Sequence, residues 1–214
     1  MILTEDSILH DKNFYDDRGF PNVGKDGYIK WGFIESVLKH FNDNSGKFLV
    51  ELGVGNSALP SLIADMNYQV TAIDKFNINS NVLKDYRVNS RIIDAKDYLI
   101  NLPDHSIDYF VDSCAMIHFN PRHDFADNDG VWECVGLMSK KLKMGGSIIV
   151  ASDIITPNDH DHNYLGEFIS YENLINIYRK HGFTMMNTFN KSIDRYTFKY
   201  NDLNLSVDGL VFQL

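Results

Sequence analysis

Residues 48–60 carry the sequence FLVELGVGNSALP, in which a short apolar run leads into an acid and two glycines. The run ends at Glu51, Gly53 and Gly55 follow, and the residues after them have the character of a helix start. Pro60 fits there, because the first turn of a helix needs no amide donor at that position. A glycine between a strand and a helix lets the backbone turn sharply and pass close to a ligand. We therefore expect a strand–loop–helix unit that binds a ligand at its loop.

The segments on either side repeat this strand–helix pattern with short connections. Such alternation is typical of a parallel sheet that helices cover on both faces. The expected strands are 47–52, 68–73, 90–93, 106–113 and 147–152, and the expected helices between them are 57–66, 79–86, 95–102 and 130–142. After a helix at 170–182, residues 183–190, 195–200 and 205–214 alternate as antiparallel strands do. The predicted fold class is α/β, a Rossmann-like doubly wound, mostly parallel sheet with an antiparallel C-terminal end.

The length of 214 residues suits one domain with a full hydrophobic core. We expect residues 1–214 to form a single domain, within which residues 1–45 make an N-terminal helical cap or lid. Tyr15, Tyr28 and Trp31 are candidates to line that lid, although ordinary helix packing explains Trp31 equally well. The apolar face expected on the helix at 130–142 consists of Val131, Trp132, Val135, Met138 and Leu142.

An acid stands at or next to the end of each of five expected strands. In doubly wound sheets, ligands bind at the carboxyl ends of the strands, near the point where the strand order reverses. We therefore expect these acids to meet at one rim of the sheet and to face a ligand there. The five acids are Glu51, Asp74, Asp94, Asp112 and Asp153.

Two classes of ligand use a glycine loop of this kind. Residues 53–58, GVGNSA, fit a loose G-x-G-x-x-G/A pattern, in which a dinucleotide pyrophosphate lies at the helix N-terminus and an acid such as Asp74 binds the ribose. The other ligand is S-adenosylmethionine, which carries a sulfonium and an ammonium charge and no phosphate. Glu51 would repel a pyrophosphate, whereas it suits a cationic ligand. The sequence therefore favours the second class.

The segment FLVELGVGNS, residues 48–57, resembles motif I of the class I S-adenosylmethionine-dependent methyltransferases, with Ser57 at the place of the usual third glycine. VTAIDKF, residues 70–76, resembles the second motif. RIIDAKDYLINLPDHSIDYFVDSCAMIHF, residues 91–119, resembles the passage from an Asp-Ala pair through a short helix to the strand of motif IV and a histidine. LMSKKLKMGGSIIVASD, residues 137–153, resembles the helix, Gly-Gly turn and strand that follow.

This resemblance covers about residues 46–155 and implies an enzyme that uses S-adenosyl-L-methionine and releases S-adenosyl-L-homocysteine. It implies that the backbone of the glycine loop approaches the methionine part of the cofactor and that Glu51 faces the amino group. A carboxylate accepts two donors at once, so Asp74 is expected to bind both ribose hydroxyls. The implied cofactor-binding residues are Glu51, Gly53, Gly55, Asp74 and Lys75, together with Asp94 at the adenine amino group, Ala95 beside the ring and Ser113 at the amino-acid end.

His118 and Asp153 are the residues that we expect to be catalytic. By the resemblance, His118 lies beside the transferring methyl, where its near-neutral free pKa suits proton removal from the acceptor. The alternative for His118 is a structural contact, in a turn or with Phe119. A divalent metal held by carboxylates at the ends of the fourth and fifth strands is a less favoured alternative, and no metal ligand is assigned. The loop NDHDH, residues 158–162, is interpreted as a solvated acidic loop rather than a metal site.

The net charge of −9 argues against nucleic acids and anionic membranes as partners. Cys114 and Cys134 are too few for a disulfide framework, and the sequence has neither a signal-peptide pattern nor an apolar run near the roughly 20 residues that span a bilayer. We therefore expect a cytoplasmic methyltransferase acting on a small molecule, with a hydroxyl, such as that of a sugar, favoured over an amine. An NAD-dependent oxidoreductase and a non-catalytic cofactor-binding protein remain alternatives. The sequence determines neither the acceptor nor the oligomeric state.

Overall fold

The structure is a computed structural model of the 214-residue chain. It describes residues 12–18, 20, 25–41, 45–116, 129–155, 164–165, 168–186, 196–200 and 203–214. Within these ranges, no helix is both long enough and apolar enough to cross a membrane.

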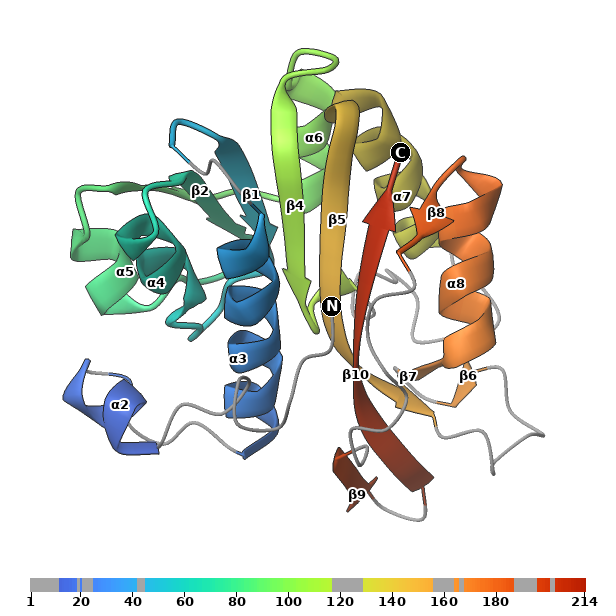
Figure 1. Ribbon diagram of the computed structural model, residues 1–214, viewed down its shortest axis with the longest axis horizontal. Coiled ribbons are helices and arrows are strands. Elements are labelled where there is room, and N and C mark those ends of the chain that lie inside the picture. The colour runs from blue at the N-terminus through green and yellow to red at the C-terminus, as the bar shows by residue number, and fades with distance from the viewer. Residues whose placement is uncertain are drawn as a thin grey trace.

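The strands form one sheet with the order β3-β2-β1-β4-β5-β10-β8 (Figure 1). All neighbours from β3 to β5 run parallel, whereas β10 runs antiparallel to β5, β8 and β9. The predicted fold class is therefore confirmed. The strands are β1 (Phe48–Leu52), β2 (Gln69–Asp74), β3 (Val88–Ile92), β4 (Ile107–Ser113), β5 (Leu142–Ile155), β6 (Tyr164–Leu165), β7 (Phe168–Ser170), β8 (Thr184–Met185), β9 (Tyr196–Tyr200) and β10 (Leu203–Gln213).

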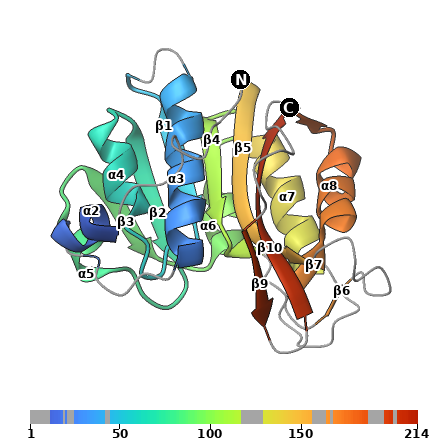
Figure 2. The same ribbon diagram turned by 60° about the horizontal axis from the view of Figure 1, so that its bottom comes forward.

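Helices cover both faces of this sheet. In Figures 1 and 2, α3 and α4 lie on one face and α6, α7 and α8 lie on the other. The strand order reverses between β1 and β4, so the carboxyl ends of these two strands mark the switch point at which doubly wound folds bind ligands. The helices are α2 (Lys12–Asp17), α3 (Lys25–His40), α4 (Leu59–Asp65), α5 (Ser80–Lys84), α6 (Ala95–Asn101), α7 (Asp129–Lys141) and α8 (Tyr171–Lys180).

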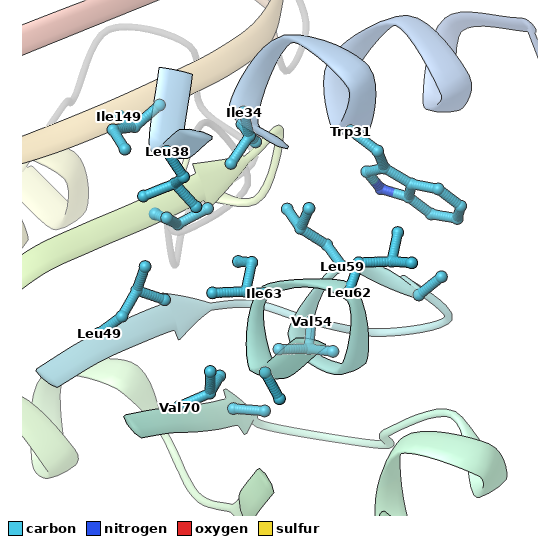
Figure 3. Close-up of a cluster of buried hydrophobic side chains, with 14 of the residues drawn as sticks. Trp31, Ile34, Leu38, Leu49, Val54, Leu59, Leu62, Ile63, Val70 and Ile149 are labelled. Atoms are coloured by element: carbon cyan, nitrogen blue, oxygen red, sulfur yellow. The ribbon is translucent and has the colours of Figure 1, made fainter. Parts of the chain in front are cut away.

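The core on the α3 face joins the N-terminal helix to the glycine-loop unit. Trp31, Ile34 and Leu38 of α3 pack in one buried cluster with α4 and with the strands beneath (Figure 3). Burying each such aliphatic side chain stabilises the fold by roughly 1.5–3 kcal/mol. The rings of Tyr15 and Tyr28 stack with centroids 5.0 Å apart, and both side chains are buried in the same cluster. The aromatic residues expected to line a lid are thus core residues, and a lid role for residues 1–45 stays a prediction.

Strand alternation assigns neighbouring residues to opposite faces. In β1, Leu49 belongs to the α3-side core, whereas Val50 and Leu52 belong to the core beneath α7 and α8. On α7, Val131, Val135 and Met138 of the expected apolar face are buried, but Trp132 was assigned to it wrongly and Leu142 belongs to β5. Trp132 is 37% exposed and its ring lies against His181, with centroids 4.1 Å apart. The reason is geometric, because a residue next to Val131 points about 100° away from it around the helix.

The structure also corrects several element boundaries. β5 begins at Leu142, directly after α7, and not at residue 147. The Gly145–Gly146 pair therefore lies inside β5. Gly145 has φ 76°, and a Cβ on Gly146 would come within 2.9 Å of the Asp108 carbonyl oxygen, so the pair permits a close approach of strands. Within the described residues of 183–190, only Thr184–Met185 forms a strand.

Candidate functional site

The loop after β1 is fastened to the end of β2. Gly53 and Gly55 have φ values of 69° and 50°, a region that residues with a side chain rarely adopt. The amides of Gly53 and Val54 donate to the Ile73 carbonyl at 2.8 and 3.1 Å, and the Gly55 amide donates to Asp74 Oδ2 at 2.9 Å. The glycines therefore serve the sharp turn that the sequence predicted.

Ser57 explains why the loop turns without a third glycine. Its Oγ accepts a hydrogen bond from the Leu59 amide at 3.0 Å, at the start of α4. The same hydroxyl also hydrogen-bonds the side chain of Glu51. A side-chain oxygen at this position satisfies an amide that the first turn of a helix leaves free. Ser57 thus joins the end of β1 to the start of α4.

Glu51 is the most deeply buried acid of the loop unit. It is 1% exposed, and its Oε2 has no hydrogen-bond partner among the described residues. Burial raises the pKa of the Glu51 carboxyl well above its usual value, the hydrogen bond from Ser57 opposes this, and Asp112 adds to it. A cation at the unpartnered oxygen would stabilise the ionised form. The position therefore suits a positively charged group and disfavours a phosphate.

Asp74 organises the loop as well as facing the rim. Its Oδ2 accepts from the Gly55 amide, and its Oδ1 accepts from the amides of Phe76 and Asn77 at 2.8 and 3.0 Å. A carboxylate has about four acceptor sites, so these three bonds leave capacity for a further donor. The expected ribose contact is compatible with this arrangement and stays a prediction.

Asp94 is the N-cap of α6, and Ala95 is the first residue of that helix. Asp94 Oδ1 accepts from the Lys96 amide at 2.9 Å, and Oδ2 pairs with Lys75 Nζ at 3.1 Å. Burial opposes ionisation of this carboxyl, but Lys75 and the helix amides outweigh it and lower its pKa. Lys75 and Asp94, two expected cofactor residues, are thus brought together. An adenine amino group at Asp94 would share this carboxylate with Lys75 and with the Lys96 amide.

Asp112 and Ser113 end β4 beside the loop, since Leu52 pairs with Asp112 in the parallel register. Asp112 Oδ1 accepts from the amides of Ala115 and Met116 at 2.8 and 3.0 Å and so shapes the turn that follows. Cys114, in this turn, has φ 63°, a region that residues with a side chain rarely adopt. Ser113 is half-buried at the rim, as a residue near a ligand would be.

Asp153, near the end of β5, forms an ion pair that the sequence analysis missed. Its Oδ2 accepts from Lys30 Nζ of α3 at 2.8 Å and lies 3.3 Å from Cys114 Sγ. Asp153 Oδ1 has no hydrogen-bond partner among the described residues. A signal for Lys30 was present, because its spacing to Phe33, Ile34 and Val37 places a charge on the apolar face of a helix.

The remaining candidates lie outside the described residues. These are His118 and the loop 158–162 with its two histidines. Within the described part of the chain, no three His, Cys, Asp or Glu side chains gather closely enough to hold a metal ion. Of the carboxylates at the ends of the fourth and fifth strands, Asp112 Oδ1 accepts from backbone amides and Asp153 Oδ2 pairs with Lys30.

No family model and no curated protein matches the chain, but solved structures do. Phosphoethanolamine N-methyltransferase 2 from Haemonchus contortus, solved with phosphomonomethylethanolamine and S-adenosylhomocysteine, superposes with a TM-score of 0.51 at 16% identity over 84% of this chain. The chain spans only 47% of that protein's length. The 1,6-didemethyltoxoflavin-N1-methyltransferase from Burkholderia thailandensis, also solved with S-adenosylhomocysteine, gives a TM-score of 0.61 at 12% identity over 94% of this chain and 84% of its own.

The [4+2]-cyclase SpnF gives a TM-score of 0.58 at 17% identity, over 78% of this chain and 62% of its own. At such identities the likeness establishes the fold, which is that of S-adenosylmethionine-dependent methyltransferases. The presence of a cyclase among the matches means that the reaction must be argued from the site.

Proposed function

We propose that the chain binds S-adenosyl-L-methionine and transfers its methyl group to a small molecule. The observation that carries this proposal is Glu51, a buried carboxyl with an unpartnered oxygen at the base of a positive-φ glycine loop. A cationic amino group would give that oxygen the donor it lacks, whereas a pyrophosphate at the same loop would meet like charge. The methyltransferase fold of the matched structures supports the same ligand.

The residues around the loop would divide the cofactor among the strand ends. Glu51, Gly53 and Gly55 would hold the amino-acid part, with Ser113 at its far side. Asp74 would accept from the ribose hydroxyls, because its carboxylate has remaining acceptor capacity. Lys75, Asp94 and Ala95 would line the adenine, with Lys75 keeping the Asp94 carboxylate ionised.

The bound cofactor supplies a methyl group on a good leaving group, so the protein's main task is to align the acceptor. Alignment of two reactants contributes roughly 7–11 kcal/mol to lowering a barrier. A hydroxyl acceptor also needs a base, for which we propose His118. We propose Asp153 as a second catalytic residue.

The net charge of −9 supports a small acceptor over a nucleic acid. Both matched methyltransferases are named for small-molecule substrates. Cys114 and Cys134 are free thiols, which suits the cytoplasmic location that we propose.

Titration calorimetry tests the cofactor directly. The wild-type protein should bind S-adenosylhomocysteine and S-adenosylmethionine, and NAD should give no heat of binding. As a control, Asp104→Asn should bind these ligands as the wild type does, because Asp104 is 62% exposed and precedes β4 at the opposite end of the sheet. Tight binding of NAD without a response to S-adenosylhomocysteine would sink the proposal.

Methyl transfer needs its own test once an acceptor is found by mass spectrometry of small-molecule mixtures incubated with labelled cofactor. His118→Ala should then reduce turnover by about 10²–10⁴-fold with nearly unchanged cofactor affinity. Wild-type turnover in this variant would assign His118 a structural role. Activity should persist in excess chelator, and its loss there, with recovery on adding a divalent ion, would restore the metal alternative.

A further inference from the structure

The two carboxylate oxygens of Asp153 are used unequally. Oδ2 accepts from Lys30 at 2.8 Å and lies 3.3 Å from the Cys114 thiol. Oδ1 is inaccessible to solvent and has no donor among the described residues. A buried acceptor without a donor is unfavourable, so the arrangement is costly for the chain alone. A donor from outside the described chain would remove that cost.

The ion pair that holds Asp153 is itself poorly solvated. The side chain of Lys30 is 7% exposed and that of Asp153 is 13% exposed. Because the desolvation of both charges offsets much of their attraction, such a pair is weak evidence for a stabilising role. It does fix the carboxylate, since Lys30 comes from α3 and Cys114 reaches over from the turn after β4. The Cys114 sulfur also accepts the Asp153 amide at 3.5 Å, which holds the residue from its backbone side.

The position of Asp153 relative to the proposed cofactor is set by the sheet. The ribose and adenine would lie over the ends of β2 and β3, where Asp74 and Asp94 stand, and the amino-acid part over β1 and β4. The next strand end in the sheet is that of β5, where Ser113 pairs with Ala151, two residues before Asp153. Alternation places Asp153 on the same face as Ala151, the α3 face. The acceptor would therefore approach the methyl group from the side of Asp153.

We propose that Asp153 Oδ1 binds the methyl acceptor by accepting a hydrogen bond from it, and that Lys30 is a positioning residue that orients this carboxylate. The acceptor then belongs to the class that presents an O–H or N–H donor at or next to the reacting atom, a hydroxyl or an amine. This inference rests on the proposed function, because it takes the cofactor position as given. It adds Lys30 to the site and assigns Asp153 to the acceptor side.

Sinefungin provides a test that needs no knowledge of the acceptor. In this cofactor analogue, a carbon bearing an ammonium group replaces the methylsulfonium, so an N–H donor stands where the methyl group would leave. Sinefungin and S-adenosylmethionine carry the same net charge, whereas S-adenosylhomocysteine lacks the positive charge at this position. Calorimetry with all three ligands therefore separates a hydrogen bond from simple attraction between charges.

Asp153→Asn should weaken sinefungin binding by about 10-fold or more, the effect of losing a hydrogen bond between charged groups. The affinity for S-adenosylmethionine should fall much less, and that for S-adenosylhomocysteine should stay within about 2-fold. Asp104→Asn, which removes an exposed charge far from the rim, should leave all three unchanged. Lys30→Met should reduce the preference for sinefungin over S-adenosylmethionine. Both ligands respond equally to the lost charge, so a change in this preference reports the orientation of the Asp153 carboxylate. Lys30→Arg keeps the charge and should retain the preference.

Each outcome decides one of the two proposals. Normal binding of S-adenosylhomocysteine with equal effects of Asp153→Asn on all ligands would overturn the acceptor site and leave the proposed function intact. Failure of all three ligands to bind the wild-type protein would overturn both. A crystal structure of the wild-type protein with sinefungin makes the same test without a substitution. The new ammonium nitrogen should lie within about 3.2 Å of Asp153 Oδ1, and a separation beyond about 4 Å would refute the contact.

Discussion

Replacing Asp74 with alanine should weaken both the fold and cofactor binding, because one carboxylate serves both. In the free protein it accepts the amides of Gly55, Phe76 and Asn77 at 2.9, 2.8 and 3.0 Å. The last two bonds lie at exposed positions, and the Gly55 bond is only partly buried. Each bond therefore contributes to stability near the lower end of the range for hydrogen bonds to charged groups. We expect Asp74→Ala to lower the free energy of unfolding by about 2–4 kcal/mol.

The same variant should lose the proposed ribose contacts. Two hydrogen bonds to a charged acceptor correspond to about 1–3 kcal/mol, which is roughly a 5- to 150-fold weaker affinity for S-adenosylhomocysteine. Asp74→Asn separates the contributions. If its amide oxygen keeps the bonds from Phe76 and Asn77, its NH₂ group faces the Gly55 amide, and donor then meets donor. We expect this variant to lose about 1–2 kcal/mol of stability, all of it at the glycine loop.

Urea unfolding monitored by tryptophan fluorescence measures the stability, because Trp31 is buried beside α4. Calorimetry with S-adenosylhomocysteine, at a temperature where the variants are folded, measures the affinity. Asp104→Ala serves as the control for an acid that is absent from the rim. An unfolding free energy within about 0.5 kcal/mol of wild type would show that the loop does not depend on Asp74. An affinity within about 2-fold would show that Asp74 does not bind the ribose.

Three further predictions follow from burial and packing. Burial raises the pKa of the Glu51 carboxyl, so its ionisation opposes folding as the pH rises. Glu51→Gln should therefore be more stable than the wild type at about pH 8, and the difference should shrink toward about pH 4. Urea unfolding at both pH values measures this difference, and a difference that grows toward about pH 4 would contradict the prediction. Burial opposes ionisation of Asp108 too, but Lys143 at 2.7 Å, the Phe48 amide and Lys47 together outweigh it and lower the pKa of Asp108. Asp108→Asn should cost about 1–3 kcal/mol of stability at neutral pH and less below about pH 4. An equal cost at both pH values would exclude the charge of Asp108 as the cause. A Cβ on Gly209 of β10 would overlap the Phe33 ring of α3, so Gly209→Ala should lower the free energy of unfolding by about 1–3 kcal/mol. In thermal unfolding, the Gly209→Ala, Phe33→Leu double variant should recover part of this loss of stability. If the two single-variant losses simply add in the double variant, the strain lies elsewhere.

Residues 48–60 were sufficient to predict the strand, the glycine turn and the helix, because the signals involved are local. Gly53 and Gly55 stand where the backbone needs a positive φ, and the apolar run before them is a buried strand. The alternation of such units predicted parallel neighbouring strands, which the structure confirms from β3 to β5, because short connections leave few other arrangements. The sequence also predicted an acid at or next to the end of each of five strands, and the carboxyl ends of such strands share one rim.

The partners of those acids were decided by tertiary structure alone. Asp94 proved to be a helix cap paired with Lys75, and Asp153 pairs with Lys30, which is 123 positions away in the chain. Spacing along one element reports which side chains share a face, but it does not report which other element covers that face. Lys30 meets Asp153 because α3 packs across β5 and β10, and the unequal use of the two Asp153 oxygens exists only once that packing is formed. Periodicity therefore determined the fold and the rim, and long-range packing determined how each charge on the rim is held.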